Sequence, residues 1–286
     1  MKILSREGLE KAFDTYCNNG VLYDTLVGFK GRQISEEDKQ EQKKFVDMFM
    51  RTDPNGYSEY GTPESTFNNP AEAFCHVVSR DFNIEEAKHR LYFNFEDHKK
   101  ELQFASEYIN MCKSVEKIPF YLKFHKTIER DDGFAIYVED QHLPEVLRIL
   151  DSLAYQNPEY TKTGDLPLAA YNCGWYGYGK ELSDHSSSFS KKVEMTIKDV
   201  VADMLYESGY DVTDEVFNPD GSSYLRYNQD KLLNSAKTLQ ANLTPENSGD
   251  FYRYFSGKLA DELRAKELLL DETSVPACIL QRERTL

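Results

Sequence analysis

The feature of the sequence that most constrains its fold is an alternation of apolar and polar side chains in three short segments. These segments are 90–95 (RLYFNF), 118–125 (IPFYLKFH) and 133–139 (GFAIYVE). Because side chains two residues apart lie on the same face of a β-strand, each segment is typical of a strand with one apolar face. Apolar residues recur at helical intervals near 102–113 and 141–156. The order strand, helix, strand, strand, helix predicts an α+β fold, in which helices cover a small, mainly antiparallel sheet.

The parts of the chain on either side of these strands are predicted to be helical. Ser35 and Asp38 have the spacing of a capping box, which predicts the start of a helix. A further helix is expected over 71–80, directly after a proline. Amphipathic helices are expected near 223–242 and 250–270.

The length of 286 residues allows one large domain or two small ones. We expect a helical N-terminal region (1–85), an α+β core (86–210) and a helical C-terminal region (211–286). Together these regions are expected to form one compact unit.

The charge of the chain restricts its partners. The 34 Lys and Arg residues and 49 Asp and Glu residues give a net charge of −15. Binding to a nucleic-acid backbone depends on clustered Lys and Arg, so we expect no nucleic-acid partner. The chain has no apolar stretch long enough to span a membrane, and its start (MKILSREGLE) becomes charged too early for a secretory signal. A cytoplasmic protein without a membrane partner is therefore expected.

Cysteine and histidine spacing gives no sign of a metal site. The five cysteines are widely spaced and include no C-x-x-C pair, and the six histidines include no HExxH motif. We therefore expect reduced thiols, no metal and no cofactor.

The polar face of the predicted sheet has an unusual composition. Apart from the amide of Asn94, its side chains are cationic or phenolic, with no carboxylate among those considered: Arg90, Tyr92, Tyr121, Lys123, His125 and Tyr137, with Arg130 just beyond the second strand. A lysine that lies along aromatic neighbours beside a guanidinium has a lowered pKa, which makes a neutral amine available as a base. Hydroxyl and guanidinium donors around it suit a phosphate. The alternative is that Lys123 lies at a solvated sheet edge and Tyr137 is an ordinary strand aromatic.

A set of ordered motifs around this face resembles a known family. PFYLKF is followed by ERDDGFAIYV, preceded by RLYFN, and trailed by GYGKE and then SSSF before a helix. This arrangement, over roughly 88–205, resembles the HopA (HrmA) family of type III effectors and their relatives in lanthipeptide and related peptide natural-product pathways. The resemblance implies a phosphoserine/phosphothreonine lyase, which eliminates phosphate from a precursor peptide by β-elimination and leaves a dehydroamino acid.

The resemblance also assigns roles to individual residues. Lys123 of PFYLKF matches the general base. Arg130 of ERDD and Tyr137 of AIYV match positions that hold phosphate and stabilise charge. Arg90 of RLYFN lies where a further basic phosphate contact is expected.

Two departures from the family pattern concern the general acid and a phosphate contact. Tyr92 stands where distant lyases place a histidine that acts as general acid, and His125 is the nearest substitute. Lys191 and Lys192 stand where relatives often carry an arginine. Because an ammonium cannot bind phosphate through two parallel hydrogen bonds as a guanidinium does, it holds this ligand less rigidly.

Two functions therefore stay open. The first is a metal-independent lyase, with a phosphorylated peptide as substrate and a kinase as partner. The second is a non-catalytic protein of the same family that binds a peptide or phosphopeptide, or acts as an effector. Production of a dehydroamino acid distinguishes the two.

Overall fold

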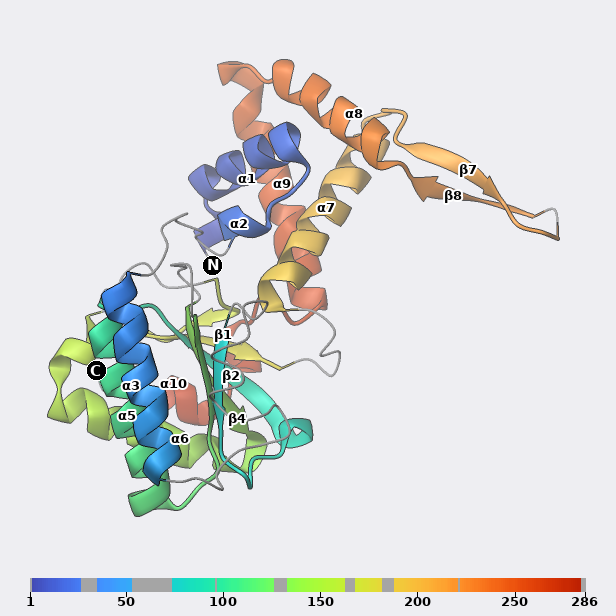
Figure 1. Cartoon of the computed structure of the whole chain (residues 1–286). Helices are drawn as coiled ribbons and strands as arrows, with labels where there is room; N and C mark the ends of the chain where they lie inside the picture. Colours follow the sequence, from blue (N-terminus) through green and yellow to red (C-terminus); the bar gives the residue numbers. More distant parts are fainter. Residues whose placement is uncertain are drawn as a thin grey trace. The chain divides into compact units, whose positions relative to one another are not determined.

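The computed structural model describes residues 2–26, 35–52, 74–95, 97–125, 133–162, 168–181, 188–220 and 222–283. In these ranges the chain has the predicted α+β fold, with helices, a six-stranded antiparallel sheet and a two-stranded antiparallel sheet (Figure 1). The chain divides into two compact units. Unit 1 comprises Met1–Leu26 and Ser186–Leu269, and unit 2 comprises Val27–His185 and Leu270–Leu286. Each unit combines segments that are distant in the sequence, so the division cuts across the three consecutive regions that we expected.

The six-stranded sheet forms the centre of unit 2. Its strands lie in the order β1 (Phe74–Val78), β3 (Tyr121–His125), β4 (Phe134–Glu139), β2 (Ala87–Phe93), β6 (Gly177–Lys180) and β5 (Tyr171–Asn172). All neighbouring strands are antiparallel. The three alternating segments form β2, β3 and β4, as predicted.

The helix expected over 71–80 is wrong for its described part, because Phe74–Val78 is strand β1. This segment, FCHVV, is rich in β-branched and aromatic side chains, which suit a strand. Cys75 and Val77 are fully buried, and the segment pairs along its whole length with β3. Pairing with β3, whose partner residues lie 43 to 51 positions further along the chain, decides this structure, and local sequence patterns do not reveal it.

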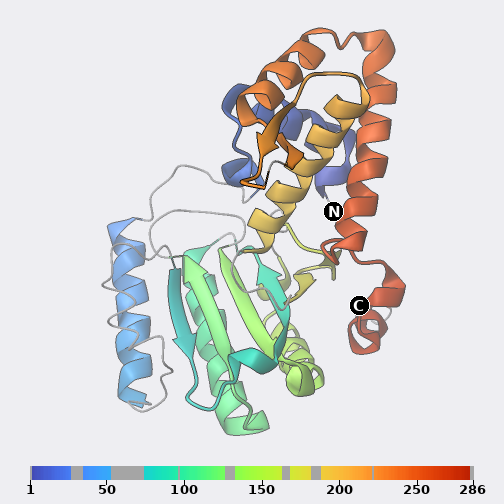
Figure 2. The same ribbon diagram turned by 90° about the vertical axis from the view of Figure 1, so that its right-hand side faces the viewer.

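Helices α5 (His98–Met111) and α6 (Leu143–Gln156) lie on one face of the six-stranded sheet (Figure 2). The apolar side chains of β2, β3 and β4 face them and are fully buried: Leu91, Phe93, Leu122, Phe124, Phe134 and Ile136. Phe104 of α5 connects the two layers, with its ring centroid 5.3 Å from that of Phe93 and 5.8 Å from that of Phe134. The core of unit 2 therefore lies between this sheet face and the two helices.

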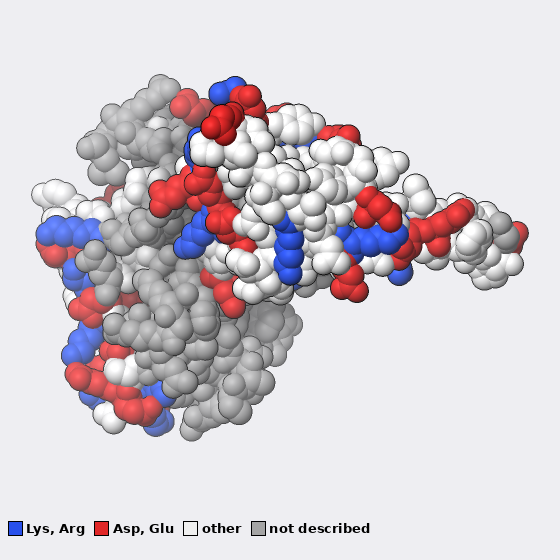
Figure 3. Space-filling view, turned by 90° about the horizontal axis from the view of Figure 1, so that it is seen from above, with Lys and Arg blue, Asp and Glu red and all other residues white. Residues whose placement is uncertain are grey.

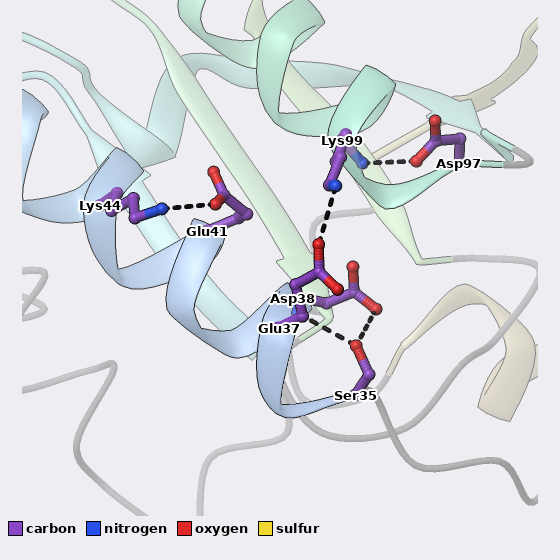
Figure 4. Close-up of polar contacts among 7 residues, drawn as sticks. All are labelled: Ser35, Glu37, Asp38, Glu41, Lys44, Asp97 and Lys99. Atoms are coloured by element: carbon purple, nitrogen blue, oxygen red, sulfur yellow. Dashed lines mark hydrogen bonds and ion pairs between the residues drawn. The ribbon is translucent and has the colours of Figure 1, made fainter.

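Helix α3 (Glu36–Thr52) packs against α5 and the end of β3. The Ser35 hydroxyl accepts a hydrogen bond from the Asp38 N–H at 3.1 Å and donates one to the Asp38 carboxylate at 2.6 Å (Figure 4). The predicted helix start is therefore confirmed, with the carboxylate bonded to the hydroxyl of the cap. Lys99 of α5 donates to Glu37 at 3.0 Å, which links the two helices (Figure 4).

Unit 1 is mainly helical. Its helices are α1 (Arg6–Asn19), α2 (Tyr23–Leu26), α7 (Phe189–Glu207), α8 (Gln229–Ala241) and α9 (Pro245–Ala265). They pack around buried aromatic side chains, among which Phe13 lies 6.2 Å from Phe255 between ring centroids. Within the described residues of both units, no helix is long and apolar enough to cross a membrane.

The helix expected near 223–242 begins later than predicted. Ser223–Tyr227 is strand β8, which forms a hairpin with β7 (Thr213–Phe217), and α8 starts only at Gln229. The Asn228 side chain accepts hydrogen bonds from the N–H groups of Asp230 and Lys231, which fixes this start. The segment before it, SYLRY, has the alternation of a strand, and the two strands pair throughout.

Candidate functional site

Strand register brings four of the predicted site residues together on the sheet face opposite α5 and α6. Two rows of paired residues cross β3, β4 and β2. The first row consists of Tyr121, Tyr137 and Arg90. The second row consists of Lys123, Ala135 and Tyr92. The alternation in the sequence therefore placed these side chains on one face, and the pairing of the strands makes them neighbours.

The Tyr137 ring is the centre of this group. The Tyr121 ring stacks on it with centroids 4.3 Å apart and planes 13° apart. The Arg90 guanidinium carbon lies 4.5 Å from the Tyr137 ring centroid, and the Lys123 amine nitrogen lies 5.6 Å from it. Lys123, the predicted base, and Arg90, a predicted phosphate contact, therefore lie against the same ring, that of Tyr137.

Lys123 also lies against a second aromatic ring. Its amine nitrogen is 4.5 Å from the ring centroid of Phe74 in β1, and the side chain is half-buried. The aromatic surroundings that we expected for this lysine are therefore present. A lowered pKa of its amine stays a prediction.

Arg90 forms an ion pair with Glu181, the residue directly after β6. Only 11% of the Arg90 side chain and 3% of the Glu181 side chain are exposed. Burial acts to lower the pKa of Arg90, but Tyr92, Tyr137 and Glu181 together raise it above its usual value, so the guanidinium stays charged. Any phosphate bound here shares Arg90 with a carboxylate.

The sequence analysis did not identify Glu181 as a site residue. Gly177 and Gly179 of β6 pair with Tyr92 and Arg90 of β2, so residues 177, 179 and 181 lie on the face of the site. The motif GYGKE contains this carboxylate, but the two residues before it on that face are glycines, which give no pattern of apolar and polar side chains. Glu181 reaches the site because β6 pairs with β2, which is a contact between distant parts of the chain.

Tyr92 is buried beside Arg90. Burial raises the pKa of its hydroxyl, and the neighbouring Arg90 offsets this rise only in part. The hydroxyl is therefore protonated at neutral pH and available as a hydrogen-bond donor. This is the protonation state that the proposed acid needs.

His125, at the end of β3, contacts residues of the helices α3 and α5. Its ring lies against that of His98 at the start of α5, with centroids 5.7 Å apart. Its backbone carbonyl accepts a hydrogen bond from the Gln42 side chain at 2.8 Å. His125 closes the end of β3 against α3 and α5, whereas Tyr92 lies beside Arg90.

Of the three remaining predicted residues, one lies outside the described residues and two belong to the other unit. Arg130 lies outside the described residues. Lys191 and Lys192 belong to α7 in unit 1, where Ser188 caps the helix by accepting a hydrogen bond from the Lys191 N–H at 3.2 Å. The Lys191 amine donates to Glu194 at 2.6 Å. In unit 1, Lys191 therefore neutralises a carboxylate of its own helix.

That carboxylate gives unit 1 a pH-dependent stability. The Glu194 side chain is fully buried and also contacts the Lys198 amine at 2.9 Å and the Leu22 N–H at 3.1 Å. Burial acts to raise the pKa of Glu194, but Lys191, the Leu22 N–H and Lys198 together lower it from 4.5 to about 2. A depressed pKa stabilises the folded state above pH 4.5, and this stabilisation is lost as the pH falls from 4.5 to about 2.

We expect Glu194→Gln to lower the free energy of unfolding at pH 7 by about 3 kcal/mol and to flatten the pH dependence of that free energy between pH 4.5 and about 2.

Urea unfolding of the full chain at a series of pH values, followed by circular dichroism, measures this effect. Glu10→Gln is the matched control in the same unit, because Glu10 pairs with Arg6 at an exposed position. We expect the control to change the free energy of unfolding by less than about 1 kcal/mol. A Glu194→Gln variant with the pH dependence of the unsubstituted chain would contradict this role.

Comparison with known proteins gives a distant likeness of fold. No family model and no curated protein matches the sequence. Two solved structures, both of an effector protein from Pseudomonas syringae, are similar to this chain. For the protein from pv. syringae strain 61 the TM-score is 0.47 at 13% identity, covering 73% of this chain and 96% of that one. For the protein from pv. tomato strain DC3000 the TM-score is 0.46 at 9% identity, covering 76% and 96%.

Proposed function

We propose that this protein is a phosphoserine/phosphothreonine lyase, which eliminates phosphate from a phosphorylated precursor peptide in ribosomal peptide maturation. The observation that supports the proposal best is that the Lys123 amine and the Arg90 guanidinium contact the same ring, that of Tyr137, at 5.6 and 4.5 Å. β-Elimination from a phosphorylated residue needs a base near Cα and a cation near the phosphate, which are separated by only a few bonds. The resemblance of the sequence motifs to the HopA family supplies the reaction class.

In the proposed reaction Lys123 acts as the base. Its neutral amine takes the proton from Cα, the electron pair of the broken C–H bond forms the Cα=Cβ double bond, and the Cβ–O bond breaks. Phosphate leaves with the electrons of that bond, and the proton stays on the Lys123 ammonium. This scheme needs no metal. The positive charge of Arg90 near the same aromatic ring favours the neutral form of the amine that the reaction requires.

In the proposed reaction Tyr92 assists the departing phosphate. Ala135 of β4 pairs with Lys123 of β3 on one side and with Tyr92 of β2 on the other. Because neighbouring strands are about 4.8 Å apart, the backbones of Lys123 and Tyr92 are about 10 Å apart. The protonated hydroxyl of Tyr92 donates a hydrogen bond to the leaving phosphate oxygen and keeps its proton, which stabilises the departing charge in place of a histidine. Lys123 and Tyr92 therefore act from opposite sides of the methyl group of Ala135.

Glu181 sets the condition under which Arg90 binds phosphate. A phosphate dianion carries more negative charge than one carboxylate, so it competes with Glu181 for the guanidinium. When phosphate has left, Glu181 pairs with Arg90 again, which promotes release of the product. In this proposal the positive charge of Arg90 is neutralised by phosphate when the substrate is bound and by Glu181 after phosphate has left.

Incubation of the full chain with a phosphothreonine peptide and with a phosphoserine peptide tests the proposal. We expect loss of the mass of phosphoric acid by mass spectrometry, no change in the unphosphorylated peptides, and addition of an external thiol to the product double bond. Saturable phosphopeptide binding without mass loss would replace the lyase with a non-catalytic phosphopeptide-binding protein. The chemistry also requires a kinase to supply the substrate, and a partner kinase is part of the proposal.

A further inference from the structure

The β7–β8 hairpin of unit 1 is exposed to an unusual degree. Phe217 is 69% exposed, Leu225 is 61% exposed and Tyr224 is 47% exposed. Within the described residues this sheet has two strands, so each strand has one edge without a ladder partner. An isolated two-stranded hairpin is at best marginally stable in water. The apolar side chains and the unpaired backbone groups both indicate that this hairpin has a binding partner.

One face of the hairpin carries two of these side chains, Phe217 and Leu225, and Tyr224 lies on the other face. The register pairs Leu225 with Glu215, Tyr227 with Thr213 and Ser223 with Phe217. Side chains two residues apart in a strand share a face, so Phe217, Leu225 and Tyr227 lie on one face of the hairpin together with Glu215. The Tyr227 hydroxyl donates to Asp203 of α7 at 2.5 Å, which anchors the base of this face. The remaining large side chains of the face point to solvent.

The charged side chains of the hairpin are mainly acidic. In Figure 3 acidic side chains gather along the projecting hairpin. Near its base Lys231 pairs with Asp211 and Asp214, at 3.0 and 2.9 Å. Further out, Glu215 accepts a hydrogen bond from the neutral Ser223 hydroxyl. A partner with cationic side chains would therefore be favoured beside β7.

The charged side chains of β7 are two carboxylates, Asp214 and Glu215, which oppose strand addition by an acidic segment but not by a cationic one. Natural edge strands are commonly blocked by Lys or Pro, and neither residue occurs in TDEVF or SYLRY. A second copy of this chain is disfavoured as a partner, because both copies carry a net charge of −15. Nucleic acids and anionic membranes are disfavoured for the same reason.

We infer that the β7 edge of this hairpin binds an extended peptide segment that carries Lys or Arg among apolar side chains. The segment adds as a third strand, with its backbone paired to β7. Its cations lie beside Glu215, and its apolar side chains cover Phe217 on the same face of β7. This inference is independent of the proposed elimination reaction.

Selection of a random dodecapeptide phage library on the full chain tests the inference. We expect enriched peptides that alternate Lys or Arg with apolar residues and lack Pro. A selected peptide, once synthesised, should lose at least about tenfold in affinity for Glu215→Lys, and its Lys-to-Glu counterpart should regain affinity for that variant. Hydrogen exchange should slow at the amides of β7 when the peptide binds.

Two further variants control for the charge change and test the apolar contact. Glu262→Lys makes the same charge change at an exposed position of α9 in the same unit and should leave the affinity unchanged. Phe217→Ser removes an exposed apolar side chain of β7 and should weaken binding without a charge change. No enrichment, enrichment of acidic peptides, or equal affinity for the Glu215→Lys and unsubstituted chains would overturn the inference.

Discussion

Replacing Lys123 by Ala is expected to lower kcat/KM for phosphate elimination by about 10²- to 10⁴-fold, the range that general acid–base catalysis contributes. Lys123 is the amine that shares the Tyr137 ring with Arg90, so in the proposed reaction its removal leaves no base near Cα. Mass spectrometry of a phosphothreonine peptide under initial-rate conditions measures the loss. The rate for the unsubstituted chain should rise with pH, because the reacting form of the base is the neutral amine.

Two variants separate the role of the base from that of a positive charge. Lys123→Arg keeps the charge, but a guanidinium does not deprotonate near neutral pH, so we expect a loss as large as that of the Ala variant. Lys113→Ala is the matched control, since the Lys113 amine also lies over a ring, 6.0 Å from the centroid of Phe120. It should retain full activity. An active Lys123→Arg variant would show that the side chain acts through its charge and would remove the base from the mechanism.

The part of the site that could be predicted depends on local alternation. Arg90, Tyr92, Lys123 and Tyr137 lie in strands whose apolar faces are evident in the sequence, so their common face followed from period two. Their adjacency required only that β2, β3 and β4 pair as neighbours. For such residues, the local periodicity and the order of the strands determine which side chains become neighbours on the sheet.

The part that could not be predicted depends on contacts between distant segments. Glu181 joins the site through pairing of β6 with β2, and β6 consists largely of glycine and tyrosine without an apolar stripe. His125 follows the alternation of β3, yet its ring lies against His98 because α5 begins at this end of the strand. Segment pairing and helix placement decide such positions, and neither is encoded in the spacing of a single strand.

The division into two units has the same origin. The hydrophobic pattern of α7 does not show whether it packs on the sheet or on other helices. In the structure α7 packs against α9, and α1 packs against α8 and α9. The segments Met1–Leu26 and Ser186–Leu269 therefore form unit 1, while Val27–His185 and the last residues, Leu270–Leu286, form unit 2 with its six-stranded sheet.

The stability of unit 2 is expected to depend strongly on one aromatic side chain. Phe104 is fully buried, and its ring contacts those of Phe93, Phe95, Tyr108, Phe134, Tyr160 and Trp175. Phe104→Ala removes this ring and leaves a cavity between helix and sheet, so we expect a loss of about 3–5 kcal/mol in the free energy of unfolding. That loss is comparable to the whole stability of a marginal domain. The sequence contains one tryptophan, Trp175, whose ring lies 6.1 Å from Phe104, so its fluorescence in urea reports the unfolding of this unit.

Tyr155→Ala is the matched control for this measurement, because it also removes an aromatic ring from a helix of unit 2. The Tyr155 side chain is 90% exposed, so its loss should change the free energy of unfolding by no more than about 0.5 kcal/mol. Phe104→Leu refills most of the cavity and should recover a large part of the lost stability. If Phe104→Ala unfolded at the same urea concentration as the unsubstituted chain, the packing of α5 on the sheet would not contribute to the free energy of unfolding of unit 2 as we expect. The positions of Arg90, Lys123 and Tyr137 would then need another support, because the helix-covered face of the same strands is what fixes their backbone.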